Sequence, residues 1–542
     1  MDEIQQLLDA GLRHIKSLCL RNGKFDNQLF DAQQQVCYDL ALSAAELQAA
    51  RAITDYAARM QAQSLEQGLV TELAECVAAT FAATTGHSIL ARLQLRAADL
   101  GLTRTALQSA VDATMQSTGS SAKVAALGAH ILEQNVTEMP SVLGSEIDMM
   151  RQSFARFAEQ VVMPLAEHIH RQDTDIPETI IQQAADLGCF GSCIPQRFGG
   201  LQPDDAADSL GMIVVTEALS RGSLGAAGSL ITRPEIAARA LLSGGTSAQQ
   251  DKWLPALATG KQLCAISITE PDTGSDVAAV SLRATATKGG WLLNGSKTWC
   301  TFAGRSEILV VLARTNPDKS LGHRGLSLFV IEKPAYAGHR FEHAQSAGGK
   351  LAGRAIATLG YRGMHSFELF FSDYFVPAEN LVGEKDGEGQ GFYFTMAGFA
   401  GGRIQTAARA IGVMQAAFER AVLYAQQRKT FGKALGAYPL IQEKLARMLA
   451  TITACRQFSY AVAKLLDNGS GQMEASLVKL FACRAAEWIT RDAMQIHGGM
   501  GYAEESAVSR YFVDARVLSI FEGSEEVLAL KVIARNLVEN AS

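Results

Sequence analysis

A change in the pattern of residues near position 262 constrains the fold of this chain more than any other feature of its sequence. From there to about residue 383, short apolar and β-branched runs alternate with turns such as Lys288-Gly289-Gly290 and Asn294-Gly295. The sequence on both sides repeats its apolar residues at helical spacing. The pattern predicts an α+β protein with a small antiparallel β-domain, a sandwich or a barrel, between helical domains. The predicted strands are 263–269, 282–287, 291–293, 308–313, 326–331 and 367–371.

Four domains are predicted along the 542 residues, a length that exceeds what one small core can organise. They are a helical extension at 1–145, a helical domain at 146–261, the β-domain at 262–385 and a helical domain at 386–542. The extension is rich in Ala, Leu and Gln and poor in Gly and Pro. Because small residues let helices approach closely, we expect it to serve in docking or oligomerisation.

Composition excludes several functional classes. The net charge of -6, without a dense Lys/Arg run, leaves no electrostatic footprint for nucleic acid. The apolar runs are too short to span a bilayer, and the first residues match no signal or transit peptide, so a cytoplasmic location is expected. The nine scattered cysteines indicate buried free thiols, and the ten histidines show no metal-binding spacing, so no metal is predicted.

Neither a strand-GxGxxG-helix nor a P-loop is present, so a bound nucleotide must be held in another way. The segment TEPDTGSD at 269–276 is a turn dense in hydroxyls, which suits the polar edge of a ring or simply caps the turn. In KTWCT at 297–301, Trp299 and Thr301 point to the same side of a strand. They could back a flat ring, or Trp299 could belong to the β-core.

Two further segments suit a phosphate-containing ligand. In RKTFG at 428–432, Arg428 offers a planar fork for a pyrophosphate beside the hydroxyl of Thr430, although a solvated helix end is the plain alternative. In QIHGGMGY at 495–502, the glycines let the backbone approach a ligand and Gln495 supplies an amide, although a plain turn would look the same. His497 is interpreted as structural.

These four segments and FEGS at 521–524, in this order, resemble the acyl-CoA dehydrogenase family from about residue 147 to the end. The resemblance implies a helical domain, a β-domain and a C-terminal four-helix bundle, here preceded by the extra extension. It also implies FAD, held without a Rossmann fold between the β-domain and the bundle, and a homodimer or homotetramer in which a neighbouring subunit completes each FAD site.

Glu522, in FEGS, is then the catalytic base. Some family members carry the base just before a CoA-contacting arginine, which here is Arg403, but Gly402 precedes it and cannot act. The helix after Glu522 holds one residue more before Arg535 than the family pattern. The resemblance implies FAD contacts from Thr269, Trp299, Thr301, Arg428, Thr430, Phe431, Gln495, Gly498, Gly499 and Ser524. It implies substrate contacts from Ser275, Arg403, Gly523 and Arg221.

In such a mechanism the base removes the α-proton of an acyl-CoA thioester, the β-hydride passes to flavin N5, and the electrons leave to electron-transferring flavoprotein. Hydrogen bonds to the thioester carbonyl, one from the backbone N–H of Glu522, stabilise the developing enolate. The length of the extended chain is similar to that of members acting on a branched dicarboxylic thioester, so the expected substrate is (2S)-methylsuccinyl-CoA and the product mesaconyl-CoA. Arg221 falls where glutaryl-CoA members bind a carboxylate, and Arg233 is a second candidate.

Three alternatives remain open. The first is a dehydrogenase of another short branched-chain acyl-CoA, for which Arg221 would be dispensable. The second is an acyl-CoA oxidase that passes electrons to oxygen. The third is a flavoprotein scaffold that no longer dehydrogenates, against which the intact Glu522 and the acidic net charge argue.

Overall fold

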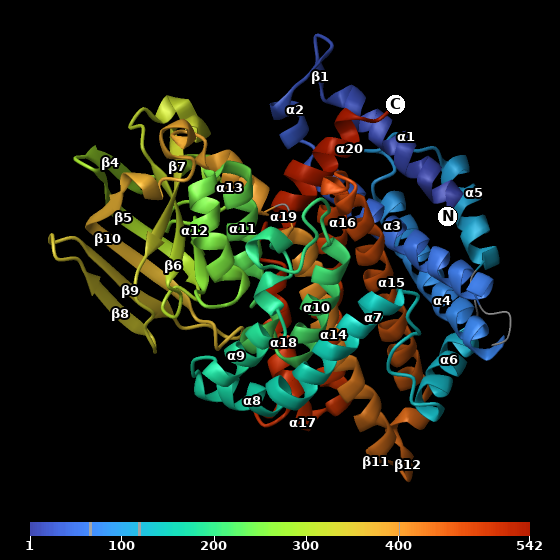
Figure 1. Cartoon of the computed structure of the whole chain (residues 1–542). Coiled ribbons are helices and arrows are strands. Elements are labelled where there is room, and N and C mark those ends of the chain that lie inside the picture. Colours follow the sequence, from blue (N-terminus) through green and yellow to red (C-terminus); the bar gives the residue numbers. More distant parts are fainter. Residues whose placement is uncertain (64–67, 118–120, 400) are drawn as a thin grey trace. The chain divides into compact units, whose positions relative to one another are not determined.

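Residues 1–63, 68–117, 121–399 and 401–542 are described by a computed structural model of the chain (Figure 1). Its contacts divide the chain into two units, which we call the helical unit (Met1–Met149 and Thr406–Ser542) and the β-containing unit (Met150–Gln405). Helices α7 (Ser145–Phe157) and α14 (Gly402–Gln427) cross from one unit to the other. Among the described residues, no helix has the length and apolar character needed to cross a bilayer. All nine cysteines are free, as predicted; eight are buried and Cys76 is exposed.

The helical unit contains both the N-terminal and the C-terminal part of the sequence. Its N-terminal elements are α1 (Asp2–Leu18), β1 (Leu20–Arg21), β2 (Lys24–Phe25), α2 (Asn27–Asp31), α3 (Gln34–Gln63), α4 (Gly68–Leu95), α5 (Arg104–Ser117) and α6 (Ser121–Glu133). After α14 come β11 (Lys429–Thr430), β12 (Lys433–Ala434), α15 (Pro439–Asp467), α16 (Gln472–His497), α17 (Gly499–Tyr502), α18 (Ala507–Leu518), α19 (Glu525–Val527) and α20 (Arg535–Glu539).

The N-terminal extension packs on the C-terminal helices of its own chain, since α3 and α4 lie against α15 and α16. The contact is close because small residues line it. At Gly128 of α6, an added Cβ would lie 2.0 Å from the backbone oxygen of Gln442 on α15, so no larger residue fits there without movement. On α4, the ring of Phe81 meets that of Phe481 on α16 edge to face, with centroids 5.8 Å apart.

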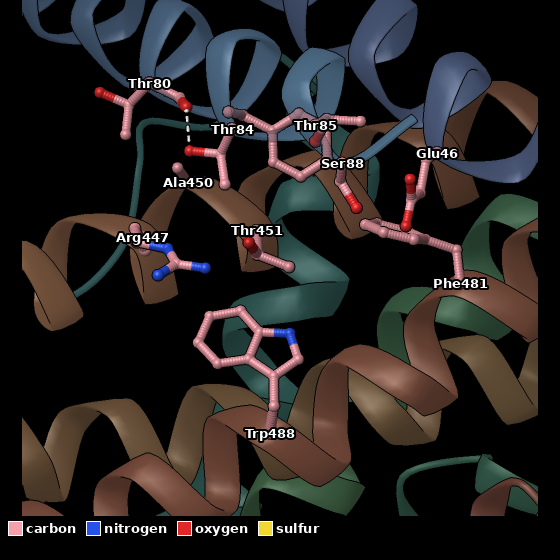
Figure 2. A pocket seen from close by; sticks show the side chains of 11 residues that line it. Glu46, Thr80, Thr84, Thr85, Ser88, Arg447, Ala450, Thr451, Phe481 and Trp488 are labelled. Carbon is pink, nitrogen blue, oxygen red and sulfur yellow. Dashed lines mark hydrogen bonds between the residues drawn. The ribbon is translucent and has the colours of Figure 1, made fainter. Parts of the chain in front are cut away.

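A cavity of about 150 Å³ remains between these helices (Figure 2). Hydroxyls of α4, including Thr84 and Ser88, line one wall, and Arg447 and Trp488 line the other. Glu46 at its edge is paired with Arg92, and burial raises the pKa of this carboxyl. None of the residues predicted to bind FAD or substrate lines this cavity.

Between α19 and α20 the chain is π-helical over Leu528–Ala534. A π-helical turn is wider than an α-helical turn and is the usual way for a helix to accommodate an additional residue. The additional residue inferred from the sequence before Arg535 therefore has a structural counterpart.

The β-containing unit consists of helices and one sheet. The helices are α8 (Met163–Gln172), α9 (Glu178–Asp186), α10 (Ser209–Gly222), α11 (Thr232–Gly244), α12 (Ser247–Ala258) and α13 (Gly391–Phe399), with π-helical segments at Ala158–Val162 and Leu224–Gly228. Of these, α11, α12 and α13 pack against the sheet. The strands are β3 (Cys264–Ser267), β4 (Arg283–Thr287), β5 (Gly290–Thr301), β6 (Ile308–Arg314), β7 (Leu326–Glu332), β8 (Arg340–Ala344), β9 (Lys350–Ile356) and β10 (Ser366–Pro377).

These strands form one eight-stranded sheet in the order β3-β6-β4-β5-β10-β9-β8, with β7 also paired to β6. Strand β6 is buried along its whole length because it has a core on each side. Ile308, Val310 and Leu312 pack with α11 and α12, whereas Leu309 and Val311 pack with β5 and β10. The predicted fold class is confirmed, although β6 pairs with β3 and β4 in parallel and only the other pairings are antiparallel. Strands β8 and β9 were not predicted.

Candidate active site

Glu522 lies in a tight turn between α18 and α19 of the helical unit. Its φ is 54° and that of Gly523 is 93°, so two successive residues adopt the left-handed conformation. Such a conformation costs about 1–3 kcal/mol at a non-glycine residue, and its presence at Glu522 points to a functional constraint. At Gly523, an added Cβ would lie 2.9 Å from the side chain of Leu528, which would have to move to make room for it.

Lys479 holds this turn in place from α16. Its ammonium donates hydrogen bonds to the backbone oxygens of Phe521 at 3.0 Å and of Gly523 at 2.5 Å, one on each side of Glu522. Burial lowers the pKa of Lys479, and the nearby Glu522 carboxylate acts in the opposite direction. The side chain therefore fixes the backbone that carries the predicted base.

Two side chains of α14 hold the carboxylate of Glu522. The guanidinium of Arg409 lies 2.8 Å from one carboxylate oxygen, and the hydroxyl of Thr406 donates to the other at 2.9 Å. Arg409 also donates to Thr406 at 2.6 Å, and its guanidinium lies 4.7 Å from the centre of the Phe521 ring. Arg409 is fully buried, whereas Glu522 keeps 16% of its side chain exposed. The base thus lies beside a desolvated cation and is still reachable.

Arg409, Thr406 and Lys479 were missed from the sequence. Arg409 lies in Ala407-Ala408-Arg409-Ala410-Ile411 and Lys479 in Leu477-Val478-Lys479-Leu480-Phe481. A single charge in the middle of an apolar helical run is the one signal that could have found them, because a long charged residue is almost never fully buried unless it is paired.

The β-containing unit brings Thr269, Trp299 and Thr301 together. The backbone N–H of Thr298 donates to the backbone oxygen of Thr269 at 2.9 Å, and the hydroxyls of Thr301 and Ser366 are 2.9 Å apart. At Thr298 and Trp299 two residues of β5 oppose one residue of β10, which is a β-bulge. Trp299 has a φ of 57° and is 56% exposed, so the bulge turns its ring out of the core. The alternative in which Trp299 is a core residue is wrong.

A buried ion pair fixes the loop that carries Thr269. Lys297 and Glu270 are 2.9 Å apart, with 0% and 5% of their side chains exposed. Lys297 also donates to the backbone oxygen of Ile268 at 2.7 Å, and Glu270 accepts from the backbone N–H of Leu282 at 2.7 Å. The pair ties the TEPDTGSD turn to the strand of KTWCT, although the sequence analysis gave neither residue a role.

We expect Lys297→Met to lower the free energy of unfolding by about 3–5 kcal/mol, because it leaves the Glu270 carboxylate buried without its cation. The matched control is Lys252→Met, which breaks a surface pair with Glu332 whose side chains are 48% and 39% exposed. This control should cost less than about 1 kcal/mol. Urea denaturation of both variants measures the difference, and equal small losses would show that the buried pair stabilises nothing.

Two other predicted loops lie at one end of the helical unit. Arg428 is exposed directly after α14, and Thr430 and Phe431 follow it, with Phe431 98% exposed and at a φ of 48°. Gln495 is exposed in the last turn of α16, and Gly498 and Gly499 come next. The rings of Tyr424 on α14 and His497 on α16 stack with centroids 4.3 Å apart, which brings the ends of the two helices together. His497 is buried and bonded to the backbone oxygen of Ala493, in agreement with its structural interpretation.

The remaining predicted residues are less gathered. Ser524 follows Glu522 in the same turn, Ser275 is exposed in the TEPDTGSD loop, and Arg403 is half-buried near the start of α14, where burial lowers its pKa. Arg221, at the end of α10, is paired with Glu159 at 2.7 Å. Arg233 is buried and donates to the backbone oxygen of Ser229 and to the hydroxyl of Tyr361. Among the arginines described here, the one beside the predicted base is Arg409.

Family models match three consecutive parts of the chain. These are the N-terminal domain of acyl-CoA dehydrogenase at residues 144–261, its middle domain at 265–374 and its C-terminal domain at 389–538. The chain belongs to the acyl-CoA dehydrogenase family. It is therefore an oxidoreductase that acts on acyl-CoA thioesters, and FAD is the cofactor of this family.

The relatives differ in how much of the chain they match. (2S)-Methylsuccinyl-CoA dehydrogenase of Cereibacter sphaeroides is 38% identical over 99% of this chain and 97% of its own length. An acyl-CoA dehydrogenase of Bacillus subtilis is 36% identical over 72% of this chain and 97% of its own. The structure of butyryl-CoA dehydrogenase from Megasphaera elsdenii, 32% identical, matches 74% of this chain and 100% of its own with a TM-score of 0.67. Only the first of these three matches includes the N-terminal extension.

The residues present fit FAD. In the β-containing unit, the exposed ring of Trp299 lies on the strand that carries Thr301 and that is bonded through Thr298 to the backbone of Thr269, which suits a flat ring with a polar edge. In the helical unit, Cβ atoms added at Gly498 or Gly499 would meet nothing within 4 Å, so the backbone there is open to a ligand. The exposed Arg428 guanidinium, at the same end of that unit, suits a pyrophosphate.

Proposed function

We propose that this enzyme oxidises (2S)-methylsuccinyl-CoA to mesaconyl-CoA with Glu522 as the base. The observation that carries the proposal is the buried Arg409, bonded to Glu522 at 2.8 Å. The match to the Cereibacter sphaeroides methylsuccinyl-CoA dehydrogenase over 99% of the chain supports it independently. The sequence analysis expects Arg221 to bind the substrate carboxylate. Because Arg221 is paired with Glu159 whereas Arg409 lies beside the base, we favour Arg409 for this role.

A dicarboxylic thioester requires a cation at this place. Its free carboxylate is attached to the β-carbon, next to the α-carbon whose proton the base removes. The substrate therefore brings a second negative charge within a few ångströms of Glu522, and two desolvated carboxylates so close repel each other strongly. An arginine has five N–H donors and can bond both carboxylates at once. A neutral short-chain acyl-CoA brings no second carboxylate to this place.

In the proposed reaction, different residues of the chain have different roles. Glu522 accepts the α-proton, its backbone N–H donates to the thioester carbonyl, and Lys479 holds the turn that aligns both groups. Bound FAD supplies the acceptor for the β-hydride, so the product carries a trans double bond between its α- and β-carbons. We propose Thr269, Trp299, Thr301, Arg428, Thr430, Phe431, Gln495, Gly498, Gly499 and Ser524 as its contacts. We propose Ser275, Arg403 and Gly523 for the CoA thioester.

The wider setting of the enzyme is proposed on its family membership. The electrons pass to electron-transferring flavoprotein, and the chain assembles in the cytoplasm as a homodimer or homotetramer. Because a second subunit would then complete each FAD site, dilution to monomers should release the cofactor.

The test is to mix the purified FAD-bound enzyme, without oxygen, with racemic methylsuccinyl-CoA and separately with butyryl-CoA. We expect methylsuccinyl-CoA to bleach the oxidised flavin at least about 100 times faster than butyryl-CoA does. This ratio corresponds to a difference of about 2.7 kcal/mol between the two activation free energies. Faster bleaching by butyryl-CoA would overturn the dicarboxylate assignment and leave the family intact. No bleaching by any short acyl-CoA would favour the scaffold alternative.

A further inference from the structure

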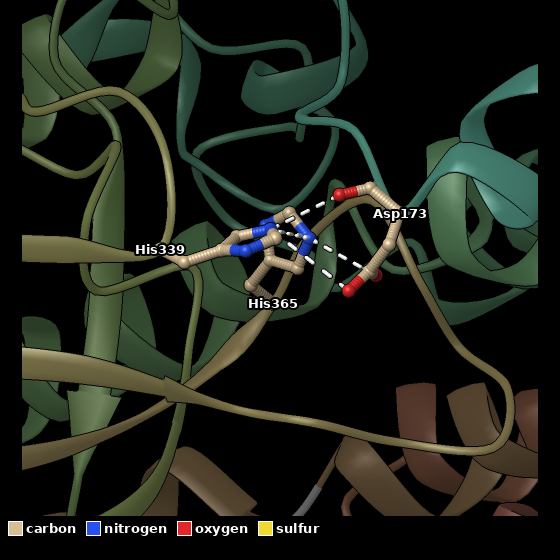
Figure 3. A group of neighbouring side chains, drawn as sticks. All are labelled: Asp173, His339 and His365. Atoms are coloured by element: carbon tan, nitrogen blue, oxygen red, sulfur yellow. Dashed lines mark hydrogen bonds and ion pairs between the residues drawn. The ribbon is translucent and has the colours of Figure 1, made fainter.

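Two histidines and an aspartate converge in the β-containing unit, apart from the residues assigned to FAD and substrate (Figure 3). Asp173 ends α8 in a left-handed conformation, His339 comes directly before β8, and His365 comes directly before β10. The Nε2 atoms of His339 and His365 are 3.0 Å apart. Asp173 places one carboxylate oxygen 3.3 Å from Nε2 of His365 and the other 3.9 Å from Nε2 of His339.

Two of these separations, 3.0 and 3.3 Å, suit ligands of one metal ion, and the 3.9 Å separation between Asp173 and His339 is slightly longer. With metal–nitrogen and metal–oxygen bonds of about 2.0–2.2 Å, neighbouring ligand atoms lie about 3.0–3.5 Å apart. The two imidazole planes are inclined by 76°, so the rings meet at their edges and do not stack. Both Nε2 atoms and the carboxylate consequently point into one small space, as Figure 3 shows.

A further carboxylate orients His365 for this role. Asp175 lies 3.1 Å from Nδ1 of His365 and itself accepts from the backbone N–H of Gly338 at 2.6 Å. A proton on Nδ1 leaves the lone pair of Nε2 directed at Asp173 and His339. Carboxylates that hold the second nitrogen of a metal-binding histidine in this way are a regular feature of zinc sites. Without a cation, a lone pair and a carboxylate would face each other at 3.3 Å.

The site can be reached from solvent. His365 is buried, but the side chains of His339 and Asp173 are 48% and 34% exposed. One further cation lies near, because Nε of Arg362 is 3.8 Å from Asp173, although it also donates to the backbone oxygen of Thr358 at 3.0 Å. An ion could therefore enter and keep water in its remaining coordination position.

We propose that Asp173, His339 and His365 bind a zinc-type divalent cation, completed by water. Two imidazoles and one carboxylate favour Zn²⁺ over Mg²⁺ or Ca²⁺, which prefer oxygen ligands alone. The ion links the segment after α8 to the beginnings of β8 and β10. This link stabilises the β-containing unit. The sequence analysis predicted no metal, because Asp173 and His339 are 166 residues apart and His339 and His365 are 26 apart.

Zn²⁺ titration by calorimetry tests this proposal, with FAD-bound enzyme first dialysed against EDTA. All proteins carry Cys76→Ser, which removes the one exposed thiol that could bind zinc by itself. We expect one Zn²⁺ per chain in this background and at least a tenfold loss of affinity in His339→Ala. Asp175→Asn should weaken binding about 10- to 100-fold, since it removes the support of a ligand. His343→Ala is the matched control, a histidine four residues along in β8, and should bind as the parent does.

Heating experiments give a second readout. Saturating Zn²⁺ should raise the melting temperature of the parent and of His343→Ala, and leave that of His339→Ala unchanged, because an ion that binds only the folded state stabilises it. Binding that survives in His339→Ala, or a parent enzyme that binds no Zn²⁺, would overturn the site. In the latter case a proton is what His365 and Asp173 share.

Discussion

Glu522→Gln should slow the reduction of the bound flavin by substrate about 10⁴-fold and leave the flavin content of the purified enzyme unchanged. A general base contributes about 10²–10⁴-fold to the rate, and this substitution removes the only predicted proton acceptor. The amide oxygen of Gln can accept from Arg409, and its NH2 group can donate to the hydroxyl of Thr406, which can also act as an acceptor. The turn therefore keeps a hydrogen-bonded side chain at this position. Rapid anaerobic mixing with the preferred thioester measures the rate.

Glu525→Gln is the matched control for this experiment. Glu525 lies three residues beyond Glu522 and is bonded to Tyr38 and Arg484 of the same unit, on the side of the N-terminal extension. We expect its rate of flavin reduction to stay within a few fold of the parent rate. A Glu522→Gln enzyme that retains FAD and reduces it at the parent rate would show that another group takes the proton.

The sequence predicts the apolar strand β6 of the β-domain and misses strands β8 and β9. Strand β6 is a continuous apolar run because both of its faces are buried, and such a run is visible without a structure. Strands β8 and β9 have exposed charged residues at several positions, among them Arg340, Glu342 and Arg354, so no apolar run marks them. The parallel pairing of β3 with β6 depends on how the intervening strands cross over, which local patterns do not reveal.

The sequence motifs contain the residues proposed for the reaction and for FAD. They do not reveal the side chains that hold Glu522. Trp299 lies at a bulge of β5, and Phe431 and Glu522 lie in turns; all three have positive φ values that their residue types do not suggest. Arg409 and Lys479 belong to no motif, and the one signal that marks them is a single charge within an apolar helical run. The metal cluster needs residues that lie far apart in the sequence to meet, which only the fold can bring about.

For the N-terminal extension, the sequence predicts the type of packing but not the partner. Its small residues predict close helix packing, and the structure uses them for that purpose against α15 and α16. The partner of those helices could not be inferred from the pattern, since a small-residue face fits a second chain equally well. The contact with Glu525 through Tyr38 places the extension next to the turn that follows the base.

Arg409→Gln should lower the preference for methylsuccinyl-CoA over butyryl-CoA, measured as a ratio of kcat/KM values, by about 30- to 5,000-fold. Loss of one partner from a buried, hydrogen-bonded charge pair costs about 2–5 kcal/mol, and each 1.36 kcal/mol corresponds to a factor of ten. The loss falls on the dicarboxylic substrate because that substrate brings the second carboxylate. The ratio cancels any effect that the substitution has on Glu522 for both substrates alike.

Two further arginine variants make this result decisive. Arg456→Gln removes another buried arginine of the helical unit, bonded to Gln415 at 2.8 Å, and should lower stability without changing the preference. Arg221→Gln tests the assignment made from the sequence, since Arg221 is bonded to Glu159 in the other unit. If Arg221→Gln abolishes the preference and Arg409→Gln keeps it, the substrate carboxylate binds at the end of α10. In that event, Arg409 serves only to hold the side chain of the base in place.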